Sequence, residues 1–176
     1  MLFKPFIMIY TTVYNSPLGE LTLASKNNKL IGVWIKGQKH FFGNLKDETK
    51  ENNDLAIFKE TRKWLDSYFN GENPQIANLD LNPEGTDFRL KVWEILKEIP
   101  YGEVITYGEI AKKIDSNMAS QAVGGAVGHN PISIIVPCHR VVGFGGKLTG
   151  YAGGLENKIK LLELEGVKIK DLKVIF

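Results

Sequence analysis

The chain has one cysteine, and two nitrogen bases follow it directly. Cys138 stands in the segment IIVPCHRVVG (134–143), between Pro137 and the pair His139 and Arg140. A cysteine acts as a nucleophile or metal ligand only as the thiolate, and an unperturbed thiol is mostly protonated at neutral pH. A neighbouring imidazole can lower the cost of ionising it. The candidates are therefore a structural cysteine, a metal ligand and a nucleophile.

A cysteine nucleophile with a histidine base also needs a group that fixes the tautomer of the imidazole, and Glu165 is the candidate. The periodicity of LENKIKLLELEG (155–166) predicts a helix that ends at Gly166. Glu165 then lies at the helix C-terminus, where the helix dipole disfavours a negative charge, so a cationic partner is expected. His139 is the candidate partner, and a solvated surface position is the alternative.

A metal site is the weakest of the three candidates. The histidines His40, His129 and His139 have no ligand-like spacing around the single thiol. Adjacent residues of a strand point to opposite faces, so Cys138 and His139 can share a site only if the strand ends there. Pro137 lacks an N–H donor and fixes its own φ, which favours a strand end and a bend.

The bulk composition excludes several classes of protein. In 176 residues a single cysteine permits no intramolecular disulfide, which favours a reducing, cytoplasmic setting. The start, MLFKPFIMIY, is interrupted by Lys4 and Pro5 and has no cleavage pattern of a secretion signal. No run approaches the ~18 apolar residues of a membrane span. A net charge of +2 is too small to imply nucleic acid by itself.

The two parts of the chain differ in pattern. Residues 9–37 alternate between apolar and polar side chains and are divided at two turn signals, which predicts a meander of three strands. A helix is expected over 55–69, and the mixed charges of 46–54 predict an exposed loop. A connection rich in proline, asparagine and glycine follows, and we place a domain boundary near residue 84.

The second part reads as helical. Apolar residues recur at helical spacing over 88–99, and Thr106 followed by Glu109 is a capping-box pattern that begins a short helix over 105–114. MASQAVGGAVGHN (118–130) predicts a further helix that stops before Pro131, after a turn of about three residues. This is the spacing of a helix-turn-helix, a weak signal when taken alone.

The second helix of that pair contains Gly124, Gly125 and Gly128. Each glycine costs a helix interior roughly 1 kcal/mol relative to alanine. Two explanations remain open at this point: close packing against a neighbouring helix, or close approach to a nucleic-acid backbone. The helix has no lysine or arginine, so it would not bind DNA through strong charge.

The segment PCHRVVG, preceded by NPISIIV and followed by GYAGGLENKIKLLELEG, closely resembles the O6-alkylguanine-DNA alkyltransferase family. The resemblance runs from about Phe88 to Gly166, and the first part of the chain matches only in size and texture. It implies an α+β fold with two domains. Residues 1–84 would form a ribonuclease-H-like meander plus helix, and 85–176 a helical domain of winged-helix or helix-turn-helix type that carries the cysteine.

The resemblance also implies catalytic roles. Cys138 would attack the alkyl carbon on guanine O6 and keep the alkyl group as a thioether. His139, acting through a water and paired with Glu165, would take the thiol proton, and Asn130 would orient this network. Tyr107 would donate a proton or hydrogen bond to guanine N3. No cofactor and no metal are expected, because the protein is itself the second substrate, and each molecule would react once.

The loop 141–153 would line the base pocket. Tyr151 would lie against the base, the Ala152 N–H at O6, and the carbonyl groups of Cys138 and Val141 at the exocyclic amine. The helix would dock in the minor groove of double-stranded DNA, and the nucleotide would be flipped out of the base stack, with Gln121 inserted in its place. The residues expected to contact substrate or DNA are Gln121, Gly124, Gly125, Val127, Arg140, Val141, Tyr151, Ala152 and Gly153.

Three positions depart from the family pattern. Gln121 and Gly128 replace arginines, and Ala152 replaces a serine, so these changes are expected to affect the affinity for DNA more than the chemistry. The expected protein is a monomer that repairs O6-alkylguanine, and O4-alkylthymine as a further lesion. The alternatives are a lesion-binding alkyltransferase-like protein, a hydrolase using the same cysteine and histidine, and a helix-turn-helix regulator. The first of these lacks the acceptor cysteine that stands here in an intact Pro-Cys-His-Arg.

Overall fold

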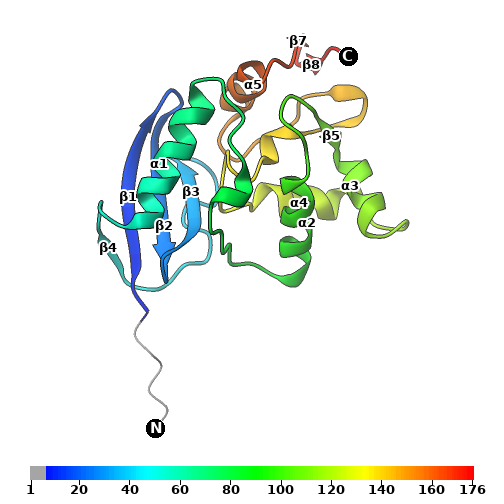
Figure 1. Cartoon of the computed structure of the whole chain (residues 1–176). Helices are drawn as coiled ribbons and strands as arrows, with labels where there is room; N and C mark the ends of the chain where they lie inside the picture. The colour runs from blue at the N-terminus through cyan, green and yellow to red at the C-terminus, as the bar shows by residue number, and fades with distance from the viewer. Residues whose placement is uncertain (1–6) are drawn as a thin grey trace.

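The computed structural model describes residues 7–176, and the prediction about a secretion signal concerns a segment of which residues 1–6 lie outside that range. Figure 1 shows a sheet with one helix packed across it, and beside it a group of shorter helices that ends at the C-terminus. This arrangement is the mixed α+β fold expected from the sequence. Within residues 7–176 no helix is both long and apolar enough to span a membrane.

The predicted meander of three strands is confirmed. Strands β1 (Ile9–Ser16), β2 (Gly19–Lys26) and β3 (Lys29–Ile35) are antiparallel neighbours. Asn27 and Asn28 form the second turn, both with positive φ, the conformation that a two-residue hairpin with a right-handed twist requires. The alternation of apolar residues places one face of these strands in the core.

The segment expected to be a loop contains a fourth strand. β4 (Thr49–Glu51) pairs in parallel with β1, so the sheet order is β3-β2-β1-β4. All three residues of β4 are exposed, which explains why their charges gave no strand signal. Helix α1 (Ala56–Phe69) packs on the sheet, as expected for 55–69, and is followed by the 3-10 turn η1 (Ile76–Asn78).

The second part consists of short helices joined by even shorter strands. The capping box predicted at Thr106 and Glu109 is present, with reciprocal hydrogen bonds at the start of α3. The elements, in order, are α2 (Asp87–Lys97), β5 (Ile105–Thr106), α3 (Tyr107–Ile114), α4 (Ser120–Gly128), η2 (Cys138–Arg140), β6 (Val141–Val142), η3 (Phe144–Gly146), α5 (Leu155–Leu164), β7 (Ile169–Lys170) and β8 (Lys173–Val174).

The helix pair α3 and α4 differs from the prediction in its connection. Helix α4 begins at Ser120, two residues later than predicted, and its N-cap residue Ala119 offers no side-chain hydrogen bond. The intervening turn therefore has five residues (115–119) instead of about three. The two helices still pack against each other, and α2 packs on α4 from the other side. The pair is thus the helix-turn-helix expected from the spacing.

Strand β3 joins the two parts through its backbone. The Val33 N–H donates to the Pro131 carbonyl at 2.9 Å, and the Ser133 N–H donates to the Val33 carbonyl at 3.0 Å. These bonds hold the segment just before Cys138 against the edge of the N-terminal sheet. The apolar core is continuous across the junction, with Val33 and Phe58 of the first part in the same cluster as Val92 of the second.

Candidate active site

The segment that carries the cysteine is not a strand. Ile134 has a φ of 73°, rare for a β-branched residue, and Cys138 to Arg140 form the 3-10 turn η2. Pro137 stands immediately before this turn, where a bend was expected. Because the chain turns here, the side chains of Cys138 and His139 are not forced to opposite faces of a sheet. All residues from 130 to 142 are buried.

Asn130 braces this turn from inside. Its amide N–H donates to the carbonyl groups of Ile132 (3.3 Å) and Val136 (2.8 Å), and its carbonyl accepts from the Ile132 N–H at 3.0 Å. The Val136 carbonyl also accepts from the Cys138 N–H at 2.8 Å. A single side chain therefore sets the position of the loop that ends in the cysteine. The sequence suggested an orienting role for Asn130, and these contacts describe how it could act.

The cysteine opens into a small cavity of about 220 Å³. Cys138 is only 4% exposed, yet it is one of the residues that line this cavity. Helix α4, the start of α3, the 150–152 loop and a turn of the N-terminal part enclose it. The lining residues are Lys39, His40, Tyr107, Gly124, Val127, Gly128, Cys138, Gly150, Tyr151 and Ala152.

The thiol is not held ionised in the free protein. Burial raises the pKa of Cys138 above its ordinary value, while Asn130, the charge of Lys158 and Tyr151 act in the opposite direction. His139 is not among the groups that lower the pKa of this thiol. The proton has to leave during the reaction instead.

His139 is fully buried and pairs with Glu165. Its Nε2 lies 2.5 Å from Glu165 Oε2, whereas Nδ1 is buried with no hydrogen-bond partner in the described protein. Burial lowers the pKa of His139, and the hydrogen bond and charge of Glu165 oppose that only in part. A neutral imidazole whose Nε2 carries the proton leaves Nδ1 as a free base.

Glu165 is the C-cap residue of α5, as the periodicity predicted. Arg140 Nε donates to Oε1 at 2.7 Å, and the Gly102 N–H donates to the same oxygen at 3.0 Å. Burial alone would raise the pKa of Glu165, but the hydrogen bonds and charges of His139 and Arg140 lower it to about 2. The carboxylate therefore stays ionised despite its burial, and its cationic partner is Arg140.

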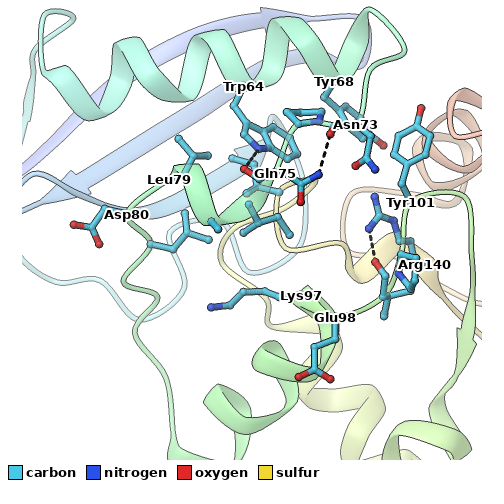
Figure 2. A pocket seen from close by; sticks show the side chains of 17 residues that line it. Trp64, Tyr68, Asn73, Gln75, Leu79, Asp80, Lys97, Glu98, Tyr101 and Arg140 are labelled. Carbon is cyan, nitrogen blue, oxygen red and sulfur yellow. Dashed lines mark hydrogen bonds between the residues drawn. The ribbon is translucent and has the colours of Figure 1, made fainter.

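Arg140 lies away from the cavity of the cysteine. It lines a second, larger cleft of about 700 Å³ between the two parts of the chain, where its Nη1 donates to the Ile99 carbonyl at 2.6 Å (Figure 2). Its guanidinium also lies over the ring of Tyr101 at 5.7 Å. These contacts brace Glu165, so the structure does not bring Arg140 together with the expected base-contacting residues.

Two tyrosines line the cavity of Cys138, which is named the acceptor cavity after the role expected of this cysteine. Tyr107 begins α3, its hydroxyl accepts from Thr149 Oγ1 at 3.2 Å, and burial raises its pKa. The hydroxyl of Tyr151 is buried beside Cys138, and burial raises its pKa well above that of an ordinary tyrosine. Gly153 beside it is required by close approach, since a Cβ there would lie 2.6 Å from Ile35 Cδ1.

The outer face of α4 is open. Gln121 and Gly125 are exposed, and a Cβ built on Gly125 or Gly128 would meet nothing within 4 Å. At Gly124 the nearest contact would be an ordinary 3.9 Å, to the ring of Tyr107. Packing against a neighbouring helix therefore does not explain these glycines. Val141 is buried behind the site, where it pairs with Ile105.

Three residues of this region were missed in the sequence. Lys158 is 1% exposed on the inner face of α5, where burial lowers its pKa to about 8 and the charge of Cys138 opposes this shift. A lysine at helical spacing among Leu155, Leu161 and Leu162 was the available signal. His40 and Tyr68 come from the N-terminal part, and nothing in their spacing relates them to Cys138.

The described residues, 7–176, contain no group of three or more histidine, cysteine, aspartate or glutamate side chains that could hold a metal ion. Models of one protein family match both parts of the chain. Residues 87–167 match the model of the 6-O-methylguanine DNA methyltransferase DNA-binding domain, and residues 9–83 match that of the ribonuclease-like domain of the same protein. The chain belongs to the 6-O-methylguanine DNA methyltransferase family.

Relatives of this family match over nearly their whole length. A methylated-DNA–protein-cysteine methyltransferase of Methanosarcina acetivorans is 49% identical over 159 residues, which covers 90% of this chain and 99% of the relative. The protein of the same name from Haemophilus influenzae is 43% identical over 163 residues, covering 93% and 89%. The crystal structure of Mycobacterium tuberculosis OGT in complex with DNA superposes with a TM-score of 0.81 at 43% identity, covering 89% of this chain and 93% of that chain.

Proposed function

We propose that this protein repairs O6-alkylguanine in double-stranded DNA by moving the alkyl group onto its own Cys138, once per molecule. The coarser activity, DNA repair as a methylated-DNA–protein-cysteine methyltransferase, follows from the family and from the names of its relatives. The observation that carries the finer proposal is the only cysteine of the chain, which faces a cavity next to a buried histidine–glutamate pair. The domain boundary is proposed near residue 84.

The proposed step transfers one carbon group and one proton. The sulfur of Cys138 forms a bond to the alkyl carbon while the bond from that carbon to O6 breaks, and its electron pair stays with guanine. The thiol proton goes through a bridging water to Nδ1 of His139. Tyr107 gives the departing guanine a proton at N3, and the proton held on His139 balances this loss. Guanine leaves neutral, and a thioether remains.

The base pocket follows from the cavity lining. Tyr151 and Ala152 line the cavity, so we place the base beside Tyr151, with the Ala152 N–H at O6. The Cys138 and Val141 carbonyls accepting from the exocyclic amine would favour guanine over adenine. The cavity of about 220 Å³ holds the reacting part of the base and a small alkyl group, with O4-alkylthymine as a further substrate.

DNA is proposed to dock on the outer face of α4. A Cβ on Gly125 or Gly128 would meet nothing within 4 Å, and one on Gly124 would make only an ordinary contact with the Tyr107 ring, which is consistent with close approach of a backbone in the minor groove. Gln121 projects from the same helix and would enter the stack in place of the flipped nucleotide. It carries no charge, so it should hold the flipped state less firmly than the arginine of the family pattern. A monomer is sufficient for this chemistry, and the expected compartment is the cytoplasm.

Intact mass after reaction tests the proposal. The protein is incubated with a duplex oligonucleotide containing one O6-methylguanine, and we expect each molecule to gain one methyl group on Cys138, without turnover. The matched control Cys138→Ala should bind the duplex and gain nothing. An unmodified wild-type mass with intact lesion binding would show instead a non-transferring lesion-binding protein. Release of product with turnover would show a hydrolase.

A further inference from the structure

We propose that Tyr68, from helix α1 of the N-terminal part, is a positioning residue for alkyl transfer: it holds Glu165 so that His139 keeps its proton on Nε2 and presents Nδ1 to the thiol. This rests on the proposed function, and it gives the ribonuclease-like domain a part in the chemistry. The family model also matches this domain, but the match does not show which of the domain's side chains contacts Glu165.

The geometry places the Tyr68 hydroxyl at the centre of the pair. It donates to Glu165 Oε2 at 2.6 Å and lies 3.4 Å from His139 Nε2. Glu165 Oε2 therefore accepts from both the tyrosine and the histidine. Within residues 7–176, Tyr68 is the one N-terminal side chain with hydrogen-bond contacts to this pair, across 97 positions of sequence to Glu165.

Sharing one oxygen between two donors determines where the histidine proton lies. A carboxylate oxygen accepts hydrogen bonds, so Nε2 must carry its hydrogen to make the 2.5 Å contact. A second donor on the same oxygen lowers its basicity and so disfavours transfer of that proton to Glu165. The ring then keeps Nδ1 unprotonated, and Nδ1 is the buried nitrogen with no partner in the described protein.

The titratable groups that face the His139–Glu165 pair come from several elements. Arg140 and His139 face Glu165 from η2, Tyr101 from the loop after α2, and Tyr68 from α1. Lys158 of α5 acts on His139. Burial, followed by the charge and hydrogen bond of Glu165, raises the pKa of Tyr68 well above that of an ordinary tyrosine. Tyr68 therefore remains a neutral donor wherever the protein is folded.

Helix α1 holds the Tyr68 ring firmly from the N-terminal side. Its ring is 1% exposed and stacks on Trp64 one turn earlier, with centroids 5.5 Å apart and planes 10° apart. Tyr101 meets it edge-on at 6.3 Å. In Figure 2 Tyr68, Tyr101 and Arg140 lie around the same cleft between the two parts. The hydroxyl can reach Glu165 only when the parts are docked.

The test is Tyr68→Phe in the full chain, which keeps the ring and its stacking and removes the hydroxyl. We expect the single-turnover rate with a duplex containing O6-methylguanine to fall about tenfold, the size of one lost hydrogen bond to a buried charge. The pH profile of that rate should shift as well. The matched control is Tyr14→Phe, since Tyr14 also donates to a carboxylate, Asp66 of the same helix, at 2.6 Å. That variant should react like the wild type.

A spectroscopic measurement on the wild type does not depend on a variant that folds. The 15N signals of the His139 ring should show a protonated Nε2 and a bare Nδ1, and Tyr68→Phe should shift them toward a mixture. A wild-type ring with the proton on Nδ1 overturns the proposal. So does a Tyr68→Phe protein whose rate, pH profile and ring signals all equal those of the wild type.

The two proposals fail separately. If the wild type never gains a methyl group on Cys138, the proposed function fails, and the ring signals alone then decide whether Tyr68 fixes the tautomer. If the methyl group is transferred but Tyr68→Phe changes neither rate nor ring signals, only the positioning role fails. Thermal unfolding of both tyrosine variants shows whether a slower rate reflects lost structure.

Discussion

Lys158 is a buried cation whose charge is coupled to that of Cys138. Its Nζ donates to the Thr149 carbonyl at 3.4 Å, so it also touches the loop that lines the acceptor cavity. Burial lowers its pKa to about 8, and a lysine with such a pKa is still mostly protonated at pH 7. We infer that this charge stabilises the thiolate as it forms, at a cost to the stability of the fold.

Lys158→Met tests both effects in one protein. Without the cation the pKa of the thiol rises further, so alkylation of Cys138 by iodoacetamide at pH 7.5 should slow by roughly 3- to 10-fold. Since the folded pKa is lowered from 10.5, Lys158 costs stability fully below pH 8, and this cost disappears as the pH rises toward 10.5. The variant should therefore be more stable at pH 7, by about 1 to 3 kcal/mol.

The control is Lys160→Met, since Lys160 stands on the same helix but has a half-exposed side chain paired with Glu156. Its thiol should react at the wild-type rate. Chemical denaturation and the iodoacetamide rate, measured on the same samples, check the prediction. A Lys158→Met protein that is less stable, or whose thiol reacts faster, would contradict it.

At the scale of single residues, the sequence predicted those members of the site that are adjacent in the chain or placed by the end of a helix. Cys138 and His139 are neighbours, and Glu165 was placed by the end of its helix and the need for a cationic partner. The structure supplies that cation through Arg140, and His139 adds a hydrogen bond. Tyr68 could not be found this way, because its relation to Glu165 exists only after two parts of the chain dock. The raised pKa of the thiol was missed because burial depends on that same docking.

At the scale of secondary-structure elements, helix α4 shows what the structure adds to the sequence pattern. Its glycines left two explanations open, and the structure removes packing against a neighbouring helix. A residue pattern gives the spacing of a helix but not what lies across from it. For the same reason, the start of α4 was predicted two residues early and β4 was missed, since exposed strands and uncapped helix starts carry few sequence signals.

Gly125→Ala should have opposite effects on the free protein and on its complex. Because a Cβ there meets nothing within 4 Å, the variant should stabilise the fold by about 1 kcal/mol, as alanine does in a helix interior. If DNA lies against this face, the added methyl group should weaken duplex binding by about tenfold or more. Thermal unfolding and fluorescence anisotropy with a labelled duplex measure the two effects.

Each outcome for Gly125→Ala has a distinct meaning. Gain of stability with loss of affinity places the DNA on this face of α4. Gain of stability with unchanged affinity would show that the helix docks through another face, and the minor-groove proposal would fail. Reactivity of Cys138 toward iodoacetamide should be unchanged in either case, because Gly125 is exposed and does not line the acceptor cavity.

At the scale of the whole molecule, the two parts are joined by backbone, core and charge together. Val33 of β3 exchanges hydrogen bonds with residues 131 and 133, the apolar core crosses the junction, and Glu165 collects donors from both sides. The change from an alternating to a helical pattern of apolar residues predicted two parts. It did not predict how they dock, because contacts between domains leave no periodic signal in the sequence. The candidate site lies at this junction, so the proposed chemistry and the stability of the fold depend on the same contacts.

This linkage predicts a loss of stability in acid. The folded pKa of Glu165 is depressed to about 2, below the 4.5 of a free side chain, so its contribution is complete above about pH 5 and is lost as the pH falls toward 2. The contribution should amount to about 3 kcal/mol at most. In Glu165→Gln the decrease in unfolding free energy between pH 6 and pH 3 should be smaller than in the wild type.

The control Glu156→Gln, at an exposed position of α5, should keep the wild-type dependence on pH. Urea denaturation at both pH values decides: equal decreases in the wild type and Glu165→Gln would mean that the buried carboxylate is not what ties the two parts together.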